Sequence, residues 1–78
     1  MSKLNRIKAV LADRDKSAKW LAERIGRDRS TVSRWCTNDM QPPLEVLYQI
    51  ADILDVDVCE LLVSNKKGRG EEPSKKKD

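Results

Sequence analysis

The sequence predicts an all-α fold, a compact five-helix bundle formed by one small domain. The chain has 78 residues, which leaves no room for a second domain. Its apolar residues recur at intervals of three and four, which places them on one face of a helix. Glycine, proline and capping residues interrupt this pattern, so the helices must be short. We expect a domain over residues 1–63, with helices at about 3–14, 18–25, 29–37, 44–54 and 58–63.

The first expected helix begins just after Ser2, whose hydroxyl group can cap its amino-terminal end. An apolar stripe at helical spacing runs along it, formed by Leu4, Ile7, Val10 and Leu11. This stripe would pack the helix against the rest of the bundle.

The next two expected helices are joined by a tight turn at Gly26, because glycine readily adopts the left-handed conformation that ends a helix. Ser17 can cap the first of the two. Asp28 can cap the second by accepting a hydrogen bond from a backbone N–H near Thr31. The helix before the turn has an apolar face formed by Ala18, Leu21, Ala22 and Ile25.

The helix after the turn has two chemically different sides. Val32, Trp35 and Cys36 fall on one side, which we expect to be buried. The opposite side carries only side chains that can donate hydrogen bonds, and the major groove of DNA is a surface crowded with acceptors. These donors are Arg29, Ser30, Ser33, Arg34 and Thr37.

This pair of helices resembles the helix-turn-helix domains of the phage-repressor and Cro family. The resemblance rests on the spacing of Leu21, Ala22, Gly26, Val32 and Trp35. It spans about residues 4–62, because the chain also matches the family at Pro42, Leu47, Ile50, Ala51 and Leu54. The resemblance implies a helix-turn-helix within the bundle and a recognition helix that enters the major groove.

The chain departs from this family at three positions. Many members have an Arg at the position of Leu11 and a Glu at that of Cys36, which form a buried ion pair. Because replacing both partners by apolar groups strands no charge, we expect Leu11 and Cys36 to lie close together in the core. Ala18 stands where the family often has a Gln that contacts phosphate, so that contact is not expected here.

A loop is expected over residues 38–43, because Pro42 and Pro43 cannot continue a helix but can begin the next one. Family members lay this loop along DNA phosphates, which implies such contacts for Asn38 and Gln41. The fourth helix follows, with a core stripe formed by Leu44, Leu47, Ile50, Ala51 and Leu54.

Beside that stripe lie Val46, Ile53 and Tyr48. They are either ordinary helix edges or part of a surface for a partner protein. Further along, Asp57 and Glu60 form a capping box that predicts the fifth helix.

Trp20 lies off the apolar face of the second helix, four residues before Arg24. Its ring can pack at the edge of the core or under the Arg24 side chain. A dimer contact and a contact with the DNA backbone are the alternatives.

Charge is distributed unevenly along the chain. Residues 1–37 carry ten basic and four acidic residues, a net charge of +6, whereas residues 38–63 carry no basic and six acidic residues, a net charge of −6. Residues 64–78 carry six basic and three acidic residues and no apolar side chain, so we expect a disordered tail there. The basic charge of the domain therefore belongs to the helices that would face nucleic acid.

The composition argues against catalysis and metal binding. The chain has no His, the commonest general base and metal ligand. Its two cysteines, Cys36 and Cys59, lack the CxxC spacing of a zinc site and are expected to be reduced thiols. We expect no enzyme activity, no cofactor and no metal. No apolar run reaches the ~20 residues of a membrane span, so a cytoplasmic location is expected.

The leading hypothesis is a sequence-specific, double-stranded DNA-binding protein that acts as a small transcriptional regulator, most simply a repressor. The residues expected to read bases are Arg29, Ser30, Ser33 and Arg34. Those expected to contact phosphates are Ser17, Lys19, Arg27, Thr37, Asn38 and Gln41. Because a single domain of this size offers a small interface, we expect a homodimer on a palindromic operator.

An alternative is an antitoxin-like module that sequesters a partner protein through the apolar edge of the fourth helix and the acidic segment 38–63. A purely structural helix bundle is a third interpretation. It leaves the donor face and the uneven charge unexplained.

Overall fold

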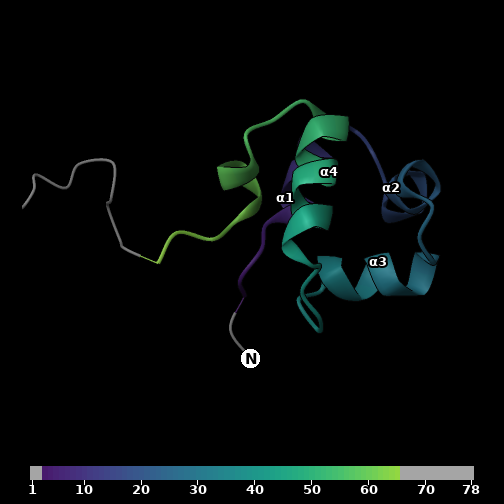
Figure 1. Ribbon diagram of the computed structural model, residues 1–78, viewed down its shortest axis with the longest axis horizontal. Helices are drawn as coiled ribbons and strands as arrows, with labels where there is room; N and C mark the ends of the chain where they lie inside the picture. The colour runs from purple at the N-terminus through teal and green to yellow at the C-terminus, as the bar shows by residue number, and fades with distance from the viewer. Residues whose placement is uncertain (1–2, 66–78) are drawn as a thin grey trace, which may run out of the picture.

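The computed structural model describes residues 3–65. Four α-helices follow one another: α1 (Ile7–Asp13), α2 (Ala18–Ile25), α3 (Arg29–Cys36) and α4 (Leu44–Leu54). A 3-10 helix, η1 (Val58–Leu61), comes after them. In Figure 1, α4 crosses in front of α1, and α2 and α3 lie together to one side. The predicted all-α class is confirmed for these residues, whose only β pairing is an isolated bridge between Asn5 and Leu62.

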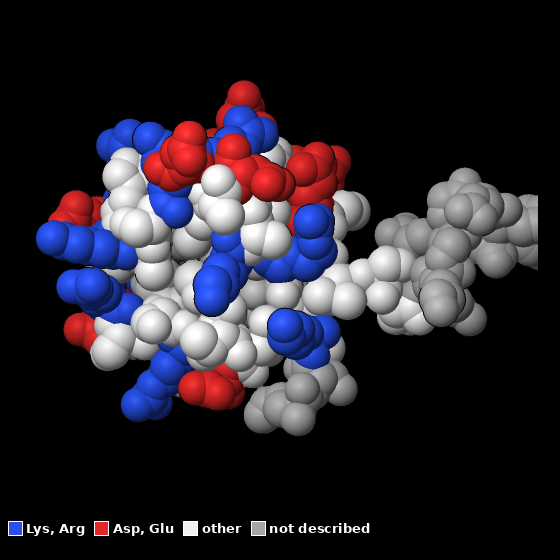
Figure 2. All heavy atoms as spheres, turned by 180° about the vertical axis from the view of Figure 1, so that it is seen from behind, with Lys and Arg blue, Asp and Glu red and all other residues white. Residues whose placement is uncertain are grey.

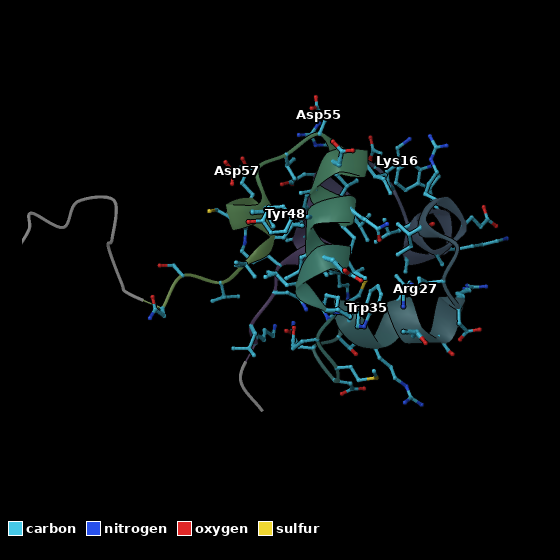
Figure 3. The ribbon with its side chains drawn as sticks, viewed as in Figure 1. Lys16, Arg27, Trp35, Tyr48, Asp55 and Asp57 are labelled. Carbon is cyan, nitrogen blue, oxygen red and sulfur yellow. The ribbon has the colours of Figure 1, made fainter. Side chains whose placement is uncertain are left out.

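One hydrophobic core takes side chains from all four α-helices and from η1. Trp35 on α3 is the largest of the fully buried side chains. It lies where α3 meets the lower end of α4 in Figure 3. Because Trp35 and Val32 anchor α3 to the core, they turn the opposite side of that helix outward.

The turn between α2 and α3 forms as predicted. Gly26 has a φ angle of 70°, the left-handed conformation that ends α2. The Ser17 hydroxyl oxygen accepts a hydrogen bond from the Trp20 amide at 3.1 Å. The Asp28 carboxylate accepts one from the Ser30 amide, also at 3.1 Å. Both predicted caps are therefore present, and together they set the start of each helix.

The first helix is shorter than predicted, because it begins at Ile7 and not near residue 3. The preceding residues are not helical and pair with the end of η1 and the residues after it. The Arg6 amide donates to the Leu61 carbonyl oxygen at 2.7 Å, and the Val63 amide donates to the Leu4 carbonyl oxygen at 3.0 Å. This pairing leaves the Leu4 side chain 56% exposed, so its assignment to the core stripe was wrong.

The start of α1 is capped by Asn5, whose side-chain oxygen accepts a hydrogen bond from the Ile7 amide at 3.0 Å. The sequence predicted Ser2 as the cap of this helix, and Ser2 lies outside the described residues. The Asn5 side chain provides a cap in the described part of the chain. The cap therefore lies deeper in the chain than the sequence pattern indicated.

The predicted fifth helix is a single 3-10 turn that ends at Leu61 and not at residue 63. Half of its predicted capping box is present, since the Asp57 carboxylate accepts a hydrogen bond from the Cys59 amide at 2.8 Å, whereas the Glu60 side chain makes no hydrogen bond within residues 3–65. The helix stops because Leu62 forms the bridge to Asn5. The proposed tail lies almost wholly outside the described residues.

The fourth helix has the predicted bounds, and four residues of its predicted core stripe are buried: Leu47, Ile50, Ala51 and Leu54. The core face differs from the prediction at its edges. Val46 is fully buried and Ile53 packs against the core, whereas Leu44 is 68% and Tyr48 58% exposed. Leu44 is thus wrongly placed in the core stripe. Val46 is unavailable to any partner, so the partner surface proposed for this helix is reduced.

Trp20 lies at the edge of the core, as one of its three interpretations predicted. The Lys16 ammonium nitrogen lies 4.8 Å from the centre of its ring, and the Arg24 guanidinium carbon lies 5.1 Å from it. Both distances are typical of cation–π contacts. The ring therefore has partners within the domain.

Leu11 and Cys36 both line a hollow between α1 and α3. Leu11 is buried, while Cys36 is half-buried and packs against the core. This arrangement agrees with the expected apolar replacement of the family's ion pair. Burial raises the pKa of the Cys36 thiol, which suits a packing role better than a reactive one.

Candidate nucleic-acid interface

The outward side of α3 gathers the predicted base-reading residues in one place. All of them are exposed, and together with Asp28 they line a single open depression on the surface. These residues are Arg29, Ser30, Ser33 and Arg34. The arrangement follows from the burial of the opposite side of the helix.

The side chains on this face differ in whether they are hydrogen-bonded within the protein. The Ser30 hydroxyl donates a short hydrogen bond to the Asp28 carboxylate. The Thr37 hydroxyl donates to the Arg34 carbonyl oxygen at 3.2 Å. By contrast, no side-chain hydrogen bond within residues 3–65 engages Arg29, Ser33 or Arg34. These three are ready to donate to a ligand.

Asp28 is the one acidic group in this depression, and the sequence identified it only as a cap. Hydrogen bonds lower its pKa, first from the Ser30 hydroxyl and then from the backbone of Thr31 and Ser30. Asp57 at the start of η1 also has a lowered pKa, because of its hydrogen bonds to Cys59. In both cases the hydrogen bonds donated to the carboxylate stabilise its ionised form.

These two caps should make the domain sensitive to acid. Because the unfolded chain has the higher pKa, it binds protons first as the pH falls. The stabilisation is complete above the unfolded value of about 4 and is lost as the pH falls through the lower folded value. We expect the melting temperature, followed by circular dichroism, to fall below about pH 4. A double variant, Asp28→Asn with Asp57→Asn, keeps cap acceptors that do not titrate and should lose less. An equal loss would contradict the assignment.

The predicted phosphate-contacting residues differ in their exposure to solvent. Ser17 and Thr37 line a shared hollow with Ser33, so the structure brings these three together. Lys19 on α2 and Arg27 in the turn are exposed. Asn38 is only 6% exposed, and the structure removes it from this group.

Asn38 instead binds the amino-terminal segment to the end of α3. Its side-chain oxygen accepts hydrogen bonds from the amides of Leu4 and Asn5 at 2.9 and 3.0 Å. Its side-chain nitrogen donates to the Asn5 carbonyl oxygen at 3.2 Å. Asn38 was therefore wrongly identified as a phosphate contact, because its polar atoms are used inside the protein.

Asn5 and Gln41 complete this polar network. The Asn5 side-chain nitrogen donates to the Trp35 carbonyl oxygen at 2.9 Å and to the Gln41 side-chain oxygen at 2.7 Å. The Gln41 nitrogen in turn donates to the Asn38 side-chain oxygen at 3.0 Å. The network holds Gln41 in one orientation beside the carboxyl-terminal end of α3.

Removing the Asn38 side chain tests this network. Asn38 has a φ of 65°, so glycine preserves its backbone, and Asn38→Gly removes only the side-chain bonds. We expect a loss of about 1–3 kcal/mol in the free energy of unfolding in urea, because buried N–H groups lose their acceptor. Hydrogen exchange should accelerate at the amides of Leu4 and Asn5. Unchanged exchange there would contradict the assigned role.

Acidic and basic side chains separate over the surface. Figure 3 shows Asp55 and Asp57 near the end of α4 that lies away from α3. Figure 2 views the molecule from behind, where Lys and Arg cross the middle of the face and Asp and Glu gather mainly along its upper edge. Acidic side chains are therefore gathered mainly at one edge of this face, although Asp28 lies at the start of α3.

Comparison with known proteins identifies this arrangement. A family model described as a Cro/C1-type HTH DNA-binding domain matches residues 6–67. The chain belongs to the Cro/C1-type helix-turn-helix family. The family expected from the spacing of the motif is thereby confirmed, and this Cro/C1-type domain has a DNA-binding fold.

A solved structure supports the same conclusion. The crystal structure of a Bacteroides fragilis protein, described as a candidate DNA-binding protein, is similar to this domain with a TM-score of 0.76. The two chains are 47% identical, and the match covers 77% of this chain and 97% of that chain. No curated protein matches the chain. Among residues 3–65, no helix is both long and apolar enough to cross a membrane.

Proposed function

We propose that this Cro/C1-type domain binds double-stranded DNA sequence-specifically, with α3 in the major groove, and acts as a small transcriptional repressor. The observation that carries this proposal is the outward face of α3, where the side chains of Arg29, Ser33 and Arg34 make no hydrogen bond to any other residue of 3–65. A major groove presents acceptors that such donors can read. A regulator of this kind works beside the chromosome, so a cytoplasmic location accompanies the proposal.

Arg34 and Arg29 are the strongest base readers in this proposal. A guanidinium group can donate two parallel hydrogen bonds to O6 and N7 of a guanine, which distinguishes that base pair from the other three. Ser33 can supplement this contact. Ser30 contributes less, because its hydroxyl must first leave the Asp28 carboxylate.

Phosphate contacts would set the orientation of α3 in the groove. We assign them to Ser17, Lys19, Arg27, Thr37 and Gln41. The Ser17 oxygen accepts the capping bond, so its hydroxyl hydrogen is still available to a phosphate. Gln41 is already held beside the end of α3 by the network around Asn38.

We propose a homodimer on a palindromic operator as the active form. One domain of this size buries little surface on DNA, and pairing two copies doubles the contact. Exposed apolar side chains could support the pairing, notably Leu44 and Tyr48 on α4. In Figure 3, Tyr48 lies on the side of α4 that faces η1, away from the outward face of α3.

Selection of bound sequences from random duplex DNA tests the proposal. The full chain should enrich one motif with two inverted half-sites about one helical turn apart. Sedimentation with the selected duplex should show two chains per duplex. Enrichment of no motif would reject sequence-specific binding, and a single chain per duplex would reject the dimer.

The antitoxin-like alternative now rests on a smaller surface. Leu44 and Tyr48 remain exposed near an acidic part of the chain, whereas Val46 is buried. If this alternative holds, Tyr48→Ala should abolish capture of a protein partner while leaving duplex binding unchanged. If the homodimer proposal holds, the same change should weaken pairing of two chains on the duplex.

A further inference from the structure

A groove runs between α1 and the carboxyl-terminal half of α3. Two adjoining hollows form it, and they share the side chains of Lys8, Ala12, Cys36 and Thr37. One end of the groove lies beside Ser17 and Ser33, and the other end reaches Lys3. The groove is therefore continuous with the surface assigned to DNA.

The charged residues that line this groove are all basic: Lys3, Arg6, Lys8 and Lys16. Two of these four are already engaged. Arg6 donates to the Glu60 carbonyl oxygen at 3.0 Å, and the Lys16 ammonium group lies over the Trp20 ring. Lys3 and Lys8 make no hydrogen bond or ion pair within residues 3–65.

The unpaired cations line a partly apolar groove, which Ala9 and Ala12 also line. Lys8 lies close enough to α3 for its charge to act on the thiol of Cys36. An ammonium group without an internal partner at such a place gains most from an external anion. The groove thus has the charge and the position of an anion site at the edge of the helix-turn-helix.

We propose that this groove binds the sugar–phosphate backbone of the same duplex, with Lys8 and Lys3 contacting phosphates beyond those held by Ser17 and Thr37. The inference rests on the proposed function and extends its contact surface from α3 onto α1. In this arrangement the DNA phosphate backbone that borders the major groove beside Ser17 runs on along the groove between α1 and α3. Figure 2 views the molecule from the opposite side to Figure 1, and basic side chains lie across the middle of that face.

Salt dependence of binding tests the proposal. The probe is a fluorescent duplex of random sequence about three helical turns long, titrated with the full chain at increasing KCl. Each lysine–phosphate contact releases counterions and contributes about 0.9 to the slope of log K against log salt. Lys8→Ala and Lys3→Ala should each reduce the slope by about that amount. Lys8→Arg should retain it.

Arg14→Ala is the matched control. Arg14 follows α1 and donates to the Asp55 carbonyl oxygen, outside the groove, so its removal takes the same charge from the same part of the chain. It should leave the slope unchanged. Thermal melting of each variant shows whether the fold is intact.

The two proposals fail in different ways. If Lys8→Ala keeps the wild-type slope on the random duplex while Arg34→Ala weakens binding to the selected operator, the groove is not a phosphate site and the proposed function stands. An equal fall in slope for Arg14→Ala would also overturn the groove, because it would show a general charge effect. If the wild-type chain binds neither the random duplex nor any selected operator, the proposed function and this extension of it fall together.

Discussion

Trp35→Ala should remove most of the stability of this domain. Trp35 is 1% exposed and joins α3 to the rest of the core. Replacing a buried Trp by Ala leaves a cavity and costs about 3–5 kcal/mol. Domains are stabilised by roughly 5–15 kcal/mol, and one this small belongs at the lower end. The variant should therefore keep at most about 2 kcal/mol of stability, so that a substantial fraction of its molecules is unfolded.

Urea denaturation followed by far-ultraviolet circular dichroism measures this loss. Tyr48→Ala provides the control, because it also removes an aromatic side chain but from a position that is 58% exposed. Its effect should be small, within about 0.5 kcal/mol. Equal losses for the two variants would show that Trp35 does not anchor α3 in solution.

Arg34→Ala should weaken binding to the selected operator without weakening the fold. A bidentate contact between Arg and guanine is worth about 1–3 kcal/mol of discrimination, which corresponds to roughly 5- to 150-fold in affinity. The loss should be confined to duplexes that carry the guanine at one position. Binding to random duplex should change little by comparison.

Affinities of wild type and Arg34→Ala for single-substitution operator variants separate the two roles of this residue. A base reader loses discrimination at one base pair, whereas a phosphate contact weakens binding to every sequence equally. Arg34→Lys keeps the charge but not the paired donors, so it should restore general affinity and not discrimination. Full discrimination by Arg34→Lys would contradict bidentate recognition.

The parts of the fold encoded by neighbouring residues were predictable. Helix α2, Gly26 and helix α3 follow from the caps at Ser17 and Asp28 together with apolar spacing, which act over a few residues. The bounds of α4 agree with the prediction for the same reason. The two ends of the domain were not predictable in this way, because Asn5 pairs with Leu62, far along the chain.

In the candidate site, too, features set by neighbouring residues were predicted and features set by distant residues were not. The exposure of Arg29, Ser33 and Arg34 followed from helical periodicity alone. The burial of Asn38 did not, because its partners Leu4 and Asn5 lie 34 and 33 residues away and no local pattern joins them. Asn38, which the family resemblance suggested as a phosphate contact, instead holds the amino-terminal segment by hydrogen bonds.

Amide chemical-shift mapping of the full chain, titrated with its selected duplex, tests the central claim most directly. We expect the largest changes on α3 from Arg29 to Cys36, with further changes at the start of α2 and along α1 near Lys8. Residues around Asp55 and Asp57, at the acidic end of α4, should change least. Largest changes at that acidic end, with α3 unaffected, would contradict a recognition role for α3.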